Sequence, residues 1–213
     1  MKYICIIFDC DGVLVDSEAI SAKVFQDMIL ELGTEIDFET VLEQITGTSM
    51  KENLLFISEI INGELPADFE TDFRKRSYEA FKTDLKPIKG IHDLLKKIKV
   101  SVGVASSGPI EKIRLNLTTT NLINFFGENI FSSYEIGRWK PDPEIYLHAA
   151  KVMGFKPGEC AVIEDSLPGI LAAKAGGFDV YGFANDKNKA AFGKLGATTF
   201  STMKELVNLL KFD

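Results

Sequence analysis

Residues 3–13, with the sequence YICIIFDCDGV, decide the fold of this 213-residue chain. A run of mostly apolar residues, β-branched or aromatic, leads directly into Asp9, Asp11 and Gly12. Such a run predicts a strand buried on both faces, as in a parallel sheet covered by helices. Ligands of open α/β sheets bind at the carboxyl ends of the strands, where these aspartates follow. Alone, the pair is equally consistent with a polar turn, because Asp and Gly are common turn residues.

The composition limits the class of protein. With 46% hydrophobic and 26% charged residues, the chain has the balance of a globular protein. Its net charge of −7 disfavours nonspecific binding to nucleic acid or anionic membranes. No apolar run approaches the roughly 20 residues of a membrane span, and we see no signal peptide. We expect a cytoplasmic monomer that acts on a small molecule and keeps Cys5, Cys10 and Cys160 as buried reduced thiols.

A helical insert is predicted after the first strand. Apolar residues recur at helical spacing over residues 18–32, 38–45, 51–61 and 66–81, and residues 16–86 contain no convincing strand. The sequence KPIKG at residues 86–90 has the Pro and Gly of a linker. We therefore divide the chain into a core domain of residues 1–15 and 87–213 and an all-α cap domain of residues 16–86.

Strand and helix patterns alternate after this linker. Helices are predicted over residues 88–98, 143–153 and 170–175 and directly after Pro109. Strands are predicted over residues 100–105, 129–132, 160–163, 178–183 and 198–200, the last between two weaker helices. This alternation predicts an α/β core with a doubly wound parallel sheet.

Polar clusters follow three of these strands, and a fourth lies in a proline-bounded loop. They consist of Asp9 and Asp11, Ser106 and Ser107, Glu164 and Asp165, and Arg138 with Lys140. Each cluster alone also fits a solvated loop or a helix cap. Because the carboxyl ends of parallel strands share one edge of a sheet, we expect the clusters to converge there.

Together these groups suit phosphoryl transfer. Mg²⁺ and the ammonium of Lys140 would offset the repulsion between carboxylates and a phosphoester dianion. A serine hydroxyl and the N–H groups at the start of the helix after Pro109 would hold phosphoryl oxygens. Asp9 could attack phosphorus to form an aspartyl-phosphate. Asp11 could protonate the leaving oxygen and then activate water.

The motifs resemble those of the haloacid dehalogenase (HAD) superfamily, and all four occur in family order. They are FDCDGV at 8–13, ASS at 105–107, KPDP at 140–143 and IEDSLPGI at 163–170. The resemblance covers essentially the whole chain, and the helical insert resembles the cap of the β-phosphoglucomutase-like subgroup. The core is therefore expected to be Rossmann-like.

This resemblance implies a role for each motif residue. Asp9 is implied as nucleophile and Mg²⁺ ligand, and Asp11 as general acid/base with its backbone carbonyl on the metal. Asp165 is implied as a further metal ligand, with Glu164 supporting the metal site. Phosphate is expected to bind Ser106, Ser107 and Lys140.

The departures from the mutase pattern favour a phosphatase. Mutases carry a histidine where this chain has Ser21, and a phosphate-binding arginine after a lysine-bearing cap loop. The matching stretch here, TGTSM at residues 46–50, has neither the lysine nor the arginine. Residues 137–150 instead resemble sugar-phosphate phosphatases, which implies a sugar phosphate or a sugar-acid phosphate such as 6-phosphogluconate as substrate. A phosphosugar mutase remains the alternative.

Two other classes fit less well. Dehalogenases lack the second aspartate and Mg²⁺, and receiver domains lack a helical insert of about 70 residues, which is long for a connection. If the cap sets substrate choice, its candidate residues lie near the entry to the first cap helix or in the glycine-bearing loop. For any single one of them, a place on the solvated cap surface is the more common role. These candidates are Glu18, Ser21, Thr48, Ser49 and Lys51.

Overall fold

The computed structural model describes residues 2–211. The chain forms two compact units, one of residues 1–15 with 87–213 and the other of residues 16–86. Within residues 2–211, no helix is both long and apolar enough to cross a membrane. Cys5, Cys10 and Cys160 are buried free thiols, as predicted.

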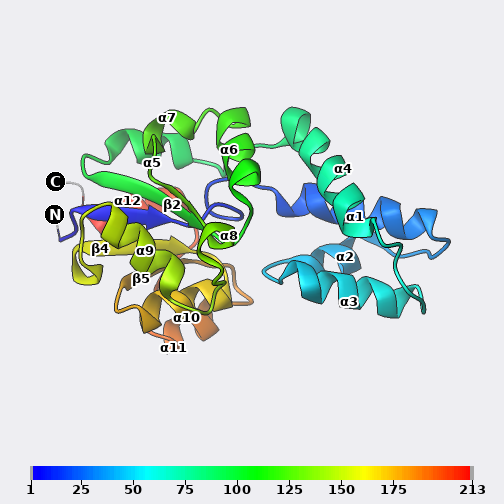
Figure 1. Cartoon of the computed structure of the whole chain (residues 1–213). Coiled ribbons are helices and arrows are strands. Elements are labelled where there is room, and N and C mark those ends of the chain that lie inside the picture. Colours follow the sequence, from blue (N-terminus) through cyan, green and yellow to red (C-terminus); the bar gives the residue numbers. More distant parts are fainter. Residues whose placement is uncertain (1, 212–213) are drawn as a thin grey trace. The chain divides into compact units, whose positions relative to one another are not determined.

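The larger unit is built on a six-stranded parallel sheet with the strand order β3-β2-β1-β4-β5-β6. Figure 1 labels β2, β4 and β5 of this sheet. The strands are β1 (Cys5–Phe8), β2 (Ser101–Ser106), β3 (Ile130–Ser132), β4 (Cys160–Glu164), β5 (Asp179–Phe183) and β6 (Thr198–Phe200). The chain passes from β1 toward one edge through β2 and β3, and then returns to β4 on the other side of β1. The order reverses beside β1, which is the position where doubly wound sheets bind their ligands. The predicted α/β class is confirmed.

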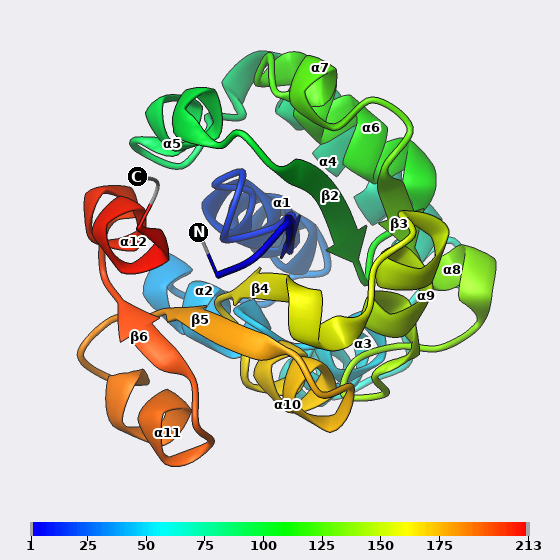
Figure 2. The same ribbon diagram turned by 90° about the vertical axis from the view of Figure 1, so that its left-hand side faces the viewer.

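Helices cover both faces of this sheet. They are α5 (Ile91–Lys97), α6 (Ile110–Thr119), α7 (Ile123–Phe126), α8 (Ser133–Ile136), α9 (Glu144–Val152), α10 (Leu167–Ala175), α11 (Lys189–Lys194) and α12 (Met203–Leu210). Figure 2 shows α5, α6, α7 and α12 on one side of the sheet, with α9 and α10 on the other. The double cover explains why β1 has no polar residue: each of its four side chains is buried.

Alternation along β1 sends neighbouring side chains into different cores. Phe8 contacts Phe126 of α7, with ring centroids 6.1 Å apart. Ile7 belongs instead to the cluster that contains Tyr146 of α9 and Ile170 of α10. Because Asp9 follows directly, its backbone N–H still donates to the carbonyl of Ile163 at 2.9 Å, and this bond fixes Asp9 at the end of the sheet.

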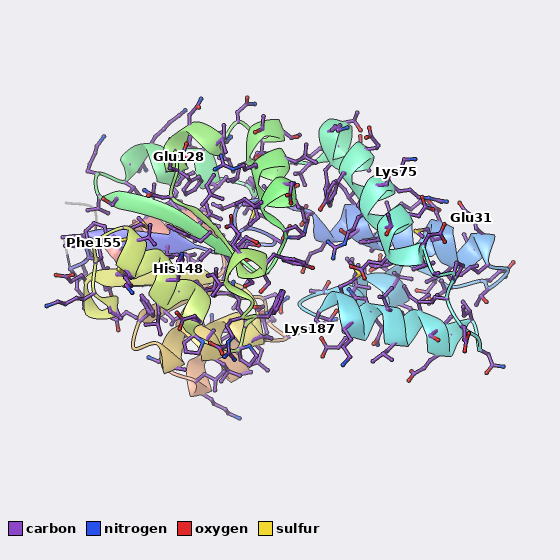
Figure 3. The ribbon with its side chains drawn as sticks, in the orientation of Figure 1. Glu31, Lys75, Glu128, His148, Phe155 and Lys187 are labelled. Atoms are coloured by element: carbon purple, nitrogen blue, oxygen red, sulfur yellow. The ribbon has the colours of Figure 1, made fainter. Side chains whose placement is uncertain are left out.

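The smaller unit, residues 16–86, contains four helices and no strand. They are α1 (Glu18–Glu31), α2 (Phe38–Ile45), α3 (Met50–Ile60) and α4 (Phe69–Asp84). Its core centres on Phe25 of α1, which stacks on Phe73 of α4 with ring centroids 3.7 Å apart. Arg76 of α4 pairs with Glu31 of α1 at 2.6 Å, and Figure 3 labels Glu31 and the exposed Lys75 beside Arg76.

Several boundaries differ from the sequence-based prediction. The helix predicted over residues 88–98 begins only at Ile91, because Gly90 has a φ of 88° and precedes it as N-cap. Helix α4 lies three residues later than the predicted 66–81 at both ends. Ser17 is the N-cap of α1, but its side chain makes no capping hydrogen bond. Helices α7 and α8 have four residues each, too few for a helical period to appear in the sequence.

Candidate active site

Asp9 and Asp11 lie on a tight turn that follows β1. The backbone N–H groups of Leu14 and Val15 both donate to the carbonyl of Cys10, at 2.9 and 3.1 Å. Gly12 has a φ of 77° within this turn. A Cβ atom at Gly12 would lie 1.9 Å from Oδ2 of Asp165, so the glycine leaves the space in which that carboxylate lies. The turn and the end of β4 therefore need this glycine for both conformation and room.

Lys140 joins the first and last of the predicted motifs. Its side chain is only 5% exposed, and Nζ donates to Oδ1 of Asp9 at 2.5 Å and to Oε1 of Glu164 at 2.7 Å. Nζ also lies 4.9 Å from the ring centroid of Tyr146. Burial alone would lower the pKa of Lys140, but the charges of Asp9 and Glu164 outweigh it and raise this pKa well above its ordinary value. Lys140 is therefore a fixed cation.

The electrostatic surroundings of Asp9 are unusual for an aspartate. Burial raises the pKa of Asp9 to about 7, the charge of Lys140 opposes this shift, and the charge of Glu164 adds to it. An added cation beside Asp9 would favour its ionised form, which is the form that acts as nucleophile or metal ligand.

Glu164 is held by hydrogen bonds on both oxygens. Besides Lys140, Tyr146 donates from its hydroxyl to Oε1 at 3.1 Å. Ser166 donates to Oε2 from its backbone N–H at 2.6 Å and from its hydroxyl at 2.8 Å. A Cβ atom at Gly169 would lie 1.9 Å from Oε1, so α10 approaches Glu164 this closely only with glycine at that position. Ser166 also caps α10 by accepting from the N–H of Gly169 at 3.1 Å.

Ser106 is the last residue of β2, and Ser107 opens the loop before α6. The hydroxyl of Ser106 accepts from the N–H of Gly108 at 3.1 Å. The carbonyl of Gly108 accepts from the hydroxyl of Ser132 at 2.6 Å, which ties the loop to the end of β3. The N-cap of α6 is Pro109, and neither serine caps this helix through its side chain. The loop thus presents polar groups next to β1, where an oxyanion can be bound.

Asp11 contacts α6 through both carboxylate oxygens. Lys112 donates from Nζ to Oδ2 at 2.8 Å, and Asn116 donates from Nδ2 to Oδ1 at 3.3 Å. The side chains of Asp11 and Lys112 are partly exposed, whereas Asn116 is fully buried. The carboxylate of Asp11 is therefore held by side chains of α6, whereas that of Asp9 is held by Lys140.

Three carboxylates are close enough to share a cation. Oxygens of Asp9, Glu164 and Asp165 all lie within 4.8 Å of one another. Carboxylate oxygens are the ligands that Mg²⁺ prefers, and the ammonium of Lys140 offsets only one of the three negative charges. The residues therefore fit a hard divalent cation. Because Glu164 already accepts four hydrogen bonds, Asp9 and Asp165 are better placed as direct ligands.

Comparison with known proteins identifies the family. A family model for haloacid dehalogenase-like hydrolases matches residues 4–177. The chain belongs to the haloacid dehalogenase-like hydrolases. This hydrolase is 32% identical over 208 residues to 6-phosphogluconate phosphatase of Escherichia coli K12, and the match covers 97% of this chain and 94% of that protein.

Two further relatives match over nearly their whole length. The hydrolase is 29% identical over 215 residues to a phosphorylated carbohydrates phosphatase of Thermotoga maritima, covering 97% of each protein. Its structure matches a haloacid dehalogenase-like protein of unknown function from Agrobacterium tumefaciens with a TM-score of 0.86 and 32% identity. That match covers 98% of this chain and 97% of the other. The expected superfamily is confirmed.

Sequence reasoning missed three residues of this hydrolase's site: Lys112, Asn116 and Tyr146. Lys112 and Asn116 are four residues apart, so they share one face of α6, and this spacing was the available signal. Tyr146 is hidden in the apolar pattern of α9, because its ring packs in the core while its hydroxyl reaches Glu164.

The cap candidates of the hydrolase have local roles in the smaller unit. Ser49 forms a capping box with Glu52, and Thr48 donates from its hydroxyl to the carbonyl of Ile45 at 2.8 Å. Glu18 and Ser21 are in the first turn of α1, and Lys51 is in the first turn of α3. Contact of these five residues with substrate stays a prediction.

The histidines of the hydrolase lie outside the site. His148 of α9, labelled in Figure 3, packs edge-on against Phe131 with ring centroids 5.8 Å apart. His92 contacts the carbonyl of Thr120 through Nε2 at 3.0 Å. Both interactions are structural.

Proposed function

We propose that this hydrolase is a Mg²⁺-dependent phosphomonoesterase that acts on a small phosphorylated metabolite through an aspartyl-phosphate. The observation that carries the proposal is the position of Lys140, whose ammonium lies 2.5 Å from Asp9 and 2.7 Å from Glu164 at the carboxyl edge of the sheet. A nucleophilic carboxylate with a fixed cation beside it suits attack on an anionic phosphoryl group.

In the first step, an oxygen of Asp9 attacks phosphorus and the bond from phosphorus to the ester oxygen breaks. The leaving oxygen takes a proton from Asp11, so the products are the free alcohol and the aspartyl-phosphate. Lys140, the hydroxyls of Ser106 and Ser107 and the nearby backbone N–H groups neutralise the phosphoryl oxygens.

In the second step, water attacks the same phosphorus. Asp11, now ionised, takes a proton from that water, the bond between phosphorus and Asp9 breaks, and inorganic phosphate leaves. The carboxylate of Asp9 and the proton of Asp11 are both restored. One pair of aspartates therefore completes the cycle.

Asp9 and Asp165 would hold Mg²⁺, with the backbone carbonyl of Asp11 as a further ligand by resemblance to the family. Glu164 would act by fixing Lys140. When bound, the metal neutralises charge on the transferred phosphoryl group. The donor set supports this assignment because three carboxylates meet within 4.8 Å.

The substrate we propose is a sugar phosphate or a sugar-acid phosphate such as 6-phosphogluconate. Support comes from the relatives named for phosphorylated carbohydrates and 6-phosphogluconate, which match 97% of this chain. The helical unit, residues 16–86, would exclude water and select the substrate, as lids do in enzymes of this kind. A mutase is disfavoured because residues 46–50 contain neither lysine nor arginine to bind a second phosphate.

The test is phosphate release from a panel of phosphorylated sugars and sugar acids, with and without Mg²⁺, for the wild type and Asp9→Asn. We expect Mg²⁺-dependent release that the variant abolishes. Isomerisation of a sugar phosphate in the presence of its bisphosphate, without net phosphate release, would instead identify a mutase. No phosphate release from any compound with Mg²⁺ present would overturn the proposal.

A further inference from the structure

We propose that Lys112 and Asn116 of α6 are positioning residues that hold the Asp11 carboxylate in the orientation required for proton transfer. The inference rests on the proposed function, in which Asp11 is the general acid/base. Neither residue belongs to the four sequence motifs, and both come from a helix that follows the phosphate-binding loop.

The two contacts are made to different oxygens of one carboxylate. Nζ of Lys112 lies 2.8 Å from Oδ2 of Asp11, and Nδ2 of Asn116 lies 3.3 Å from Oδ1. The terminal torsion of an aspartate has broad minima, so a single contact leaves the carboxylate free to rotate. Donors on both oxygens fix the plane of the carboxylate as well as its position.

The burial of the Asn116 side-chain amide is unfavourable unless a hydrogen bond compensates for it. The residue is fully buried, and Oδ1 has no hydrogen-bond partner among the residues that the structure describes. An apolar side chain would avoid this desolvation penalty. The amide must also point its nitrogen toward Asp11, because the reversed orientation would place two oxygens together. The contact with Asp11 is therefore the gain that offsets an unpaired buried oxygen.

Lys112 connects Asp11 to the phosphate-binding loop. A Cβ atom on Gly108 would lie 3.5 Å from Oγ of Ser106, 3.6 Å from Cδ of Lys112 and 4.0 Å from Oδ2 of Asp11. All three side chains thus surround one small residue. Because α6 begins directly after this loop, a fixed α6 keeps the phosphate-binding groups and the proton donor in register.

The charge of Lys112 has a separate effect on Asp11. Asp11 follows Asp9 by two residues and lies near a cluster of acidic side chains, which repels its carboxylate. The ammonium of Lys112 attracts the carboxylate from the side of α6. Removing this cation would take away the contact that holds Oδ2 of Asp11 against α6.

The experiment compares two leaving groups. An alkyl phosphate needs a positioned acid because its alkoxide leaves poorly, whereas 4-nitrophenyl phosphate releases a stable phenolate without one. For Lys112→Met and Asn116→Ala, we expect kcat/KM for the alkyl phosphate to fall at least about tenfold and that for the nitrophenyl ester less than about threefold. Asp11→Asn should show the same selectivity, and Lys112→Arg should retain more alkyl-phosphate activity than Lys112→Met.

Matched controls come from the same helix. Arg114→Met removes an exposed cation of α6, and Leu117→Ala removes a fully buried side chain of the same helix. Neither should change the ratio of the two kcat/KM values, even where thermal unfolding shows a less stable protein. This control separates positioning of Asp11 from general damage to the helix.

Different outcomes overturn the two proposals. If Asp11→Asn is selective against the alkyl phosphate but both α6 variants are not, the positioning role is wrong and the proposed function stands. If the wild type hydrolyses neither ester, or Asp9→Asn retains full activity, the proposed function itself fails. An equal loss on both esters in Lys112→Met and Asn116→Ala would also overturn the positioning role.

Discussion

Lys140 illustrates how single residues of this site depend on one another. Its ammonium is buried between Asp9 and Glu164, and Tyr146 and Ser166 hold Glu164 in turn. Burying one cation with two carboxylates is costly unless each group keeps its hydrogen bonds. The remaining negative charge of the cluster explains why a divalent cation is expected at this edge.

Asp165 gives the most direct test of that cation. We predict that Mg²⁺ raises the unfolding temperature of the wild type, because a ligand that binds only the folded state stabilises it by about 2.7 kcal/mol at 100 times its dissociation constant. In Asp165→Asn the shift should be much smaller. Differential scanning fluorimetry over a Mg²⁺ series measures both, with Asp142→Asn as a control in the Lys140 loop. An identical shift in Asp165→Asn would remove this residue from the metal site.

At the scale of elements, glycines decide how closely α10 approaches β4. Ala is usually better than Gly inside a helix by up to about 1 kcal/mol. Gly193 in α11 has nothing within 4 Å of its Cβ position, whereas the Cβ position of Gly169 in α10 lies 1.9 Å from Glu164. The same substitution should therefore have opposite effects in the two helices.

We predict that Gly193→Ala leaves activity unchanged and raises the free energy of unfolding by roughly 0.5–1 kcal/mol, the helix-propensity gain. Gly169→Ala should lower the free energy of unfolding and reduce phosphate release, because Glu164 must move and Lys140 then loses a partner. Urea unfolding and phosphate release of both variants measure these effects. If Gly169→Ala were fully active and more stable than the wild type, the predicted clash with Glu164 would be wrong, and Glu164 would be able to move aside.

Most elements were predictable because their patterns are local. The apolar run of β1, the alternation of strands and helices and the Pro and Gly before α5 each require only neighbouring residues. Helices α7 and α8 were not predictable, since four residues cannot establish a period. The start of α5 was placed too early because Ile88 continues the apolar pattern although the helix begins after Gly90.

The candidate site was predictable from sequence where its residues directly follow strands, and at Lys140 in the proline-bounded loop. Asp9 and Glu164 meet at Lys140 because parallel strands end at one edge, which the sequence implies, and Ser106 ends the neighbouring strand β2. Lys112 and Asn116 approach Asp11 from a different element about a hundred residues away in the chain. Such a contact depends on how α6 packs, and the sequence pattern of α6 does not specify it. By contrast, the capping box of Ser49 and Glu52 at the start of α3 can be read from the spacing of the two residues.

At the scale of the whole molecule, the helical unit is inserted where two chain segments pair. Val15 and Pro87 form an antiparallel bridge, and the N–H of Ile88 donates to the carbonyl of Leu14 at 2.9 Å. Each unit has an apolar cluster of its own, around Tyr146 in the core and around Phe25 in the insert. Val15 and Pro87, where the chain leaves and re-enters the core, are therefore held together by contacts of the core itself.

We predict that replacing residues 16–86 with a short Gly-Ser linker leaves a folded core. Because Val15 and Pro87 are paired, a few residues can join them, and the sheet and the catalytic edge lie within the remaining segments. The shortened protein should still release phosphate from 4-nitrophenyl phosphate, more slowly than the full chain because it lacks the water exclusion that we propose for the helical unit. It should lose preference among sugar phosphates, since the proposed selecting residues are absent.

Circular dichroism and cooperative urea unfolding would establish that the shortened protein is folded, and the Asp9→Asn version of it gives the background rate. The decisive measurement is the ratio of kcat/KM values across the sugar-phosphate panel, because a general loss of activity scales all values alike. If the shortened, folded protein ranked the panel as the full chain does, substrate choice would have to come from the core edge around Ser106 and Lys140. A flattened ranking would assign it to the helical unit.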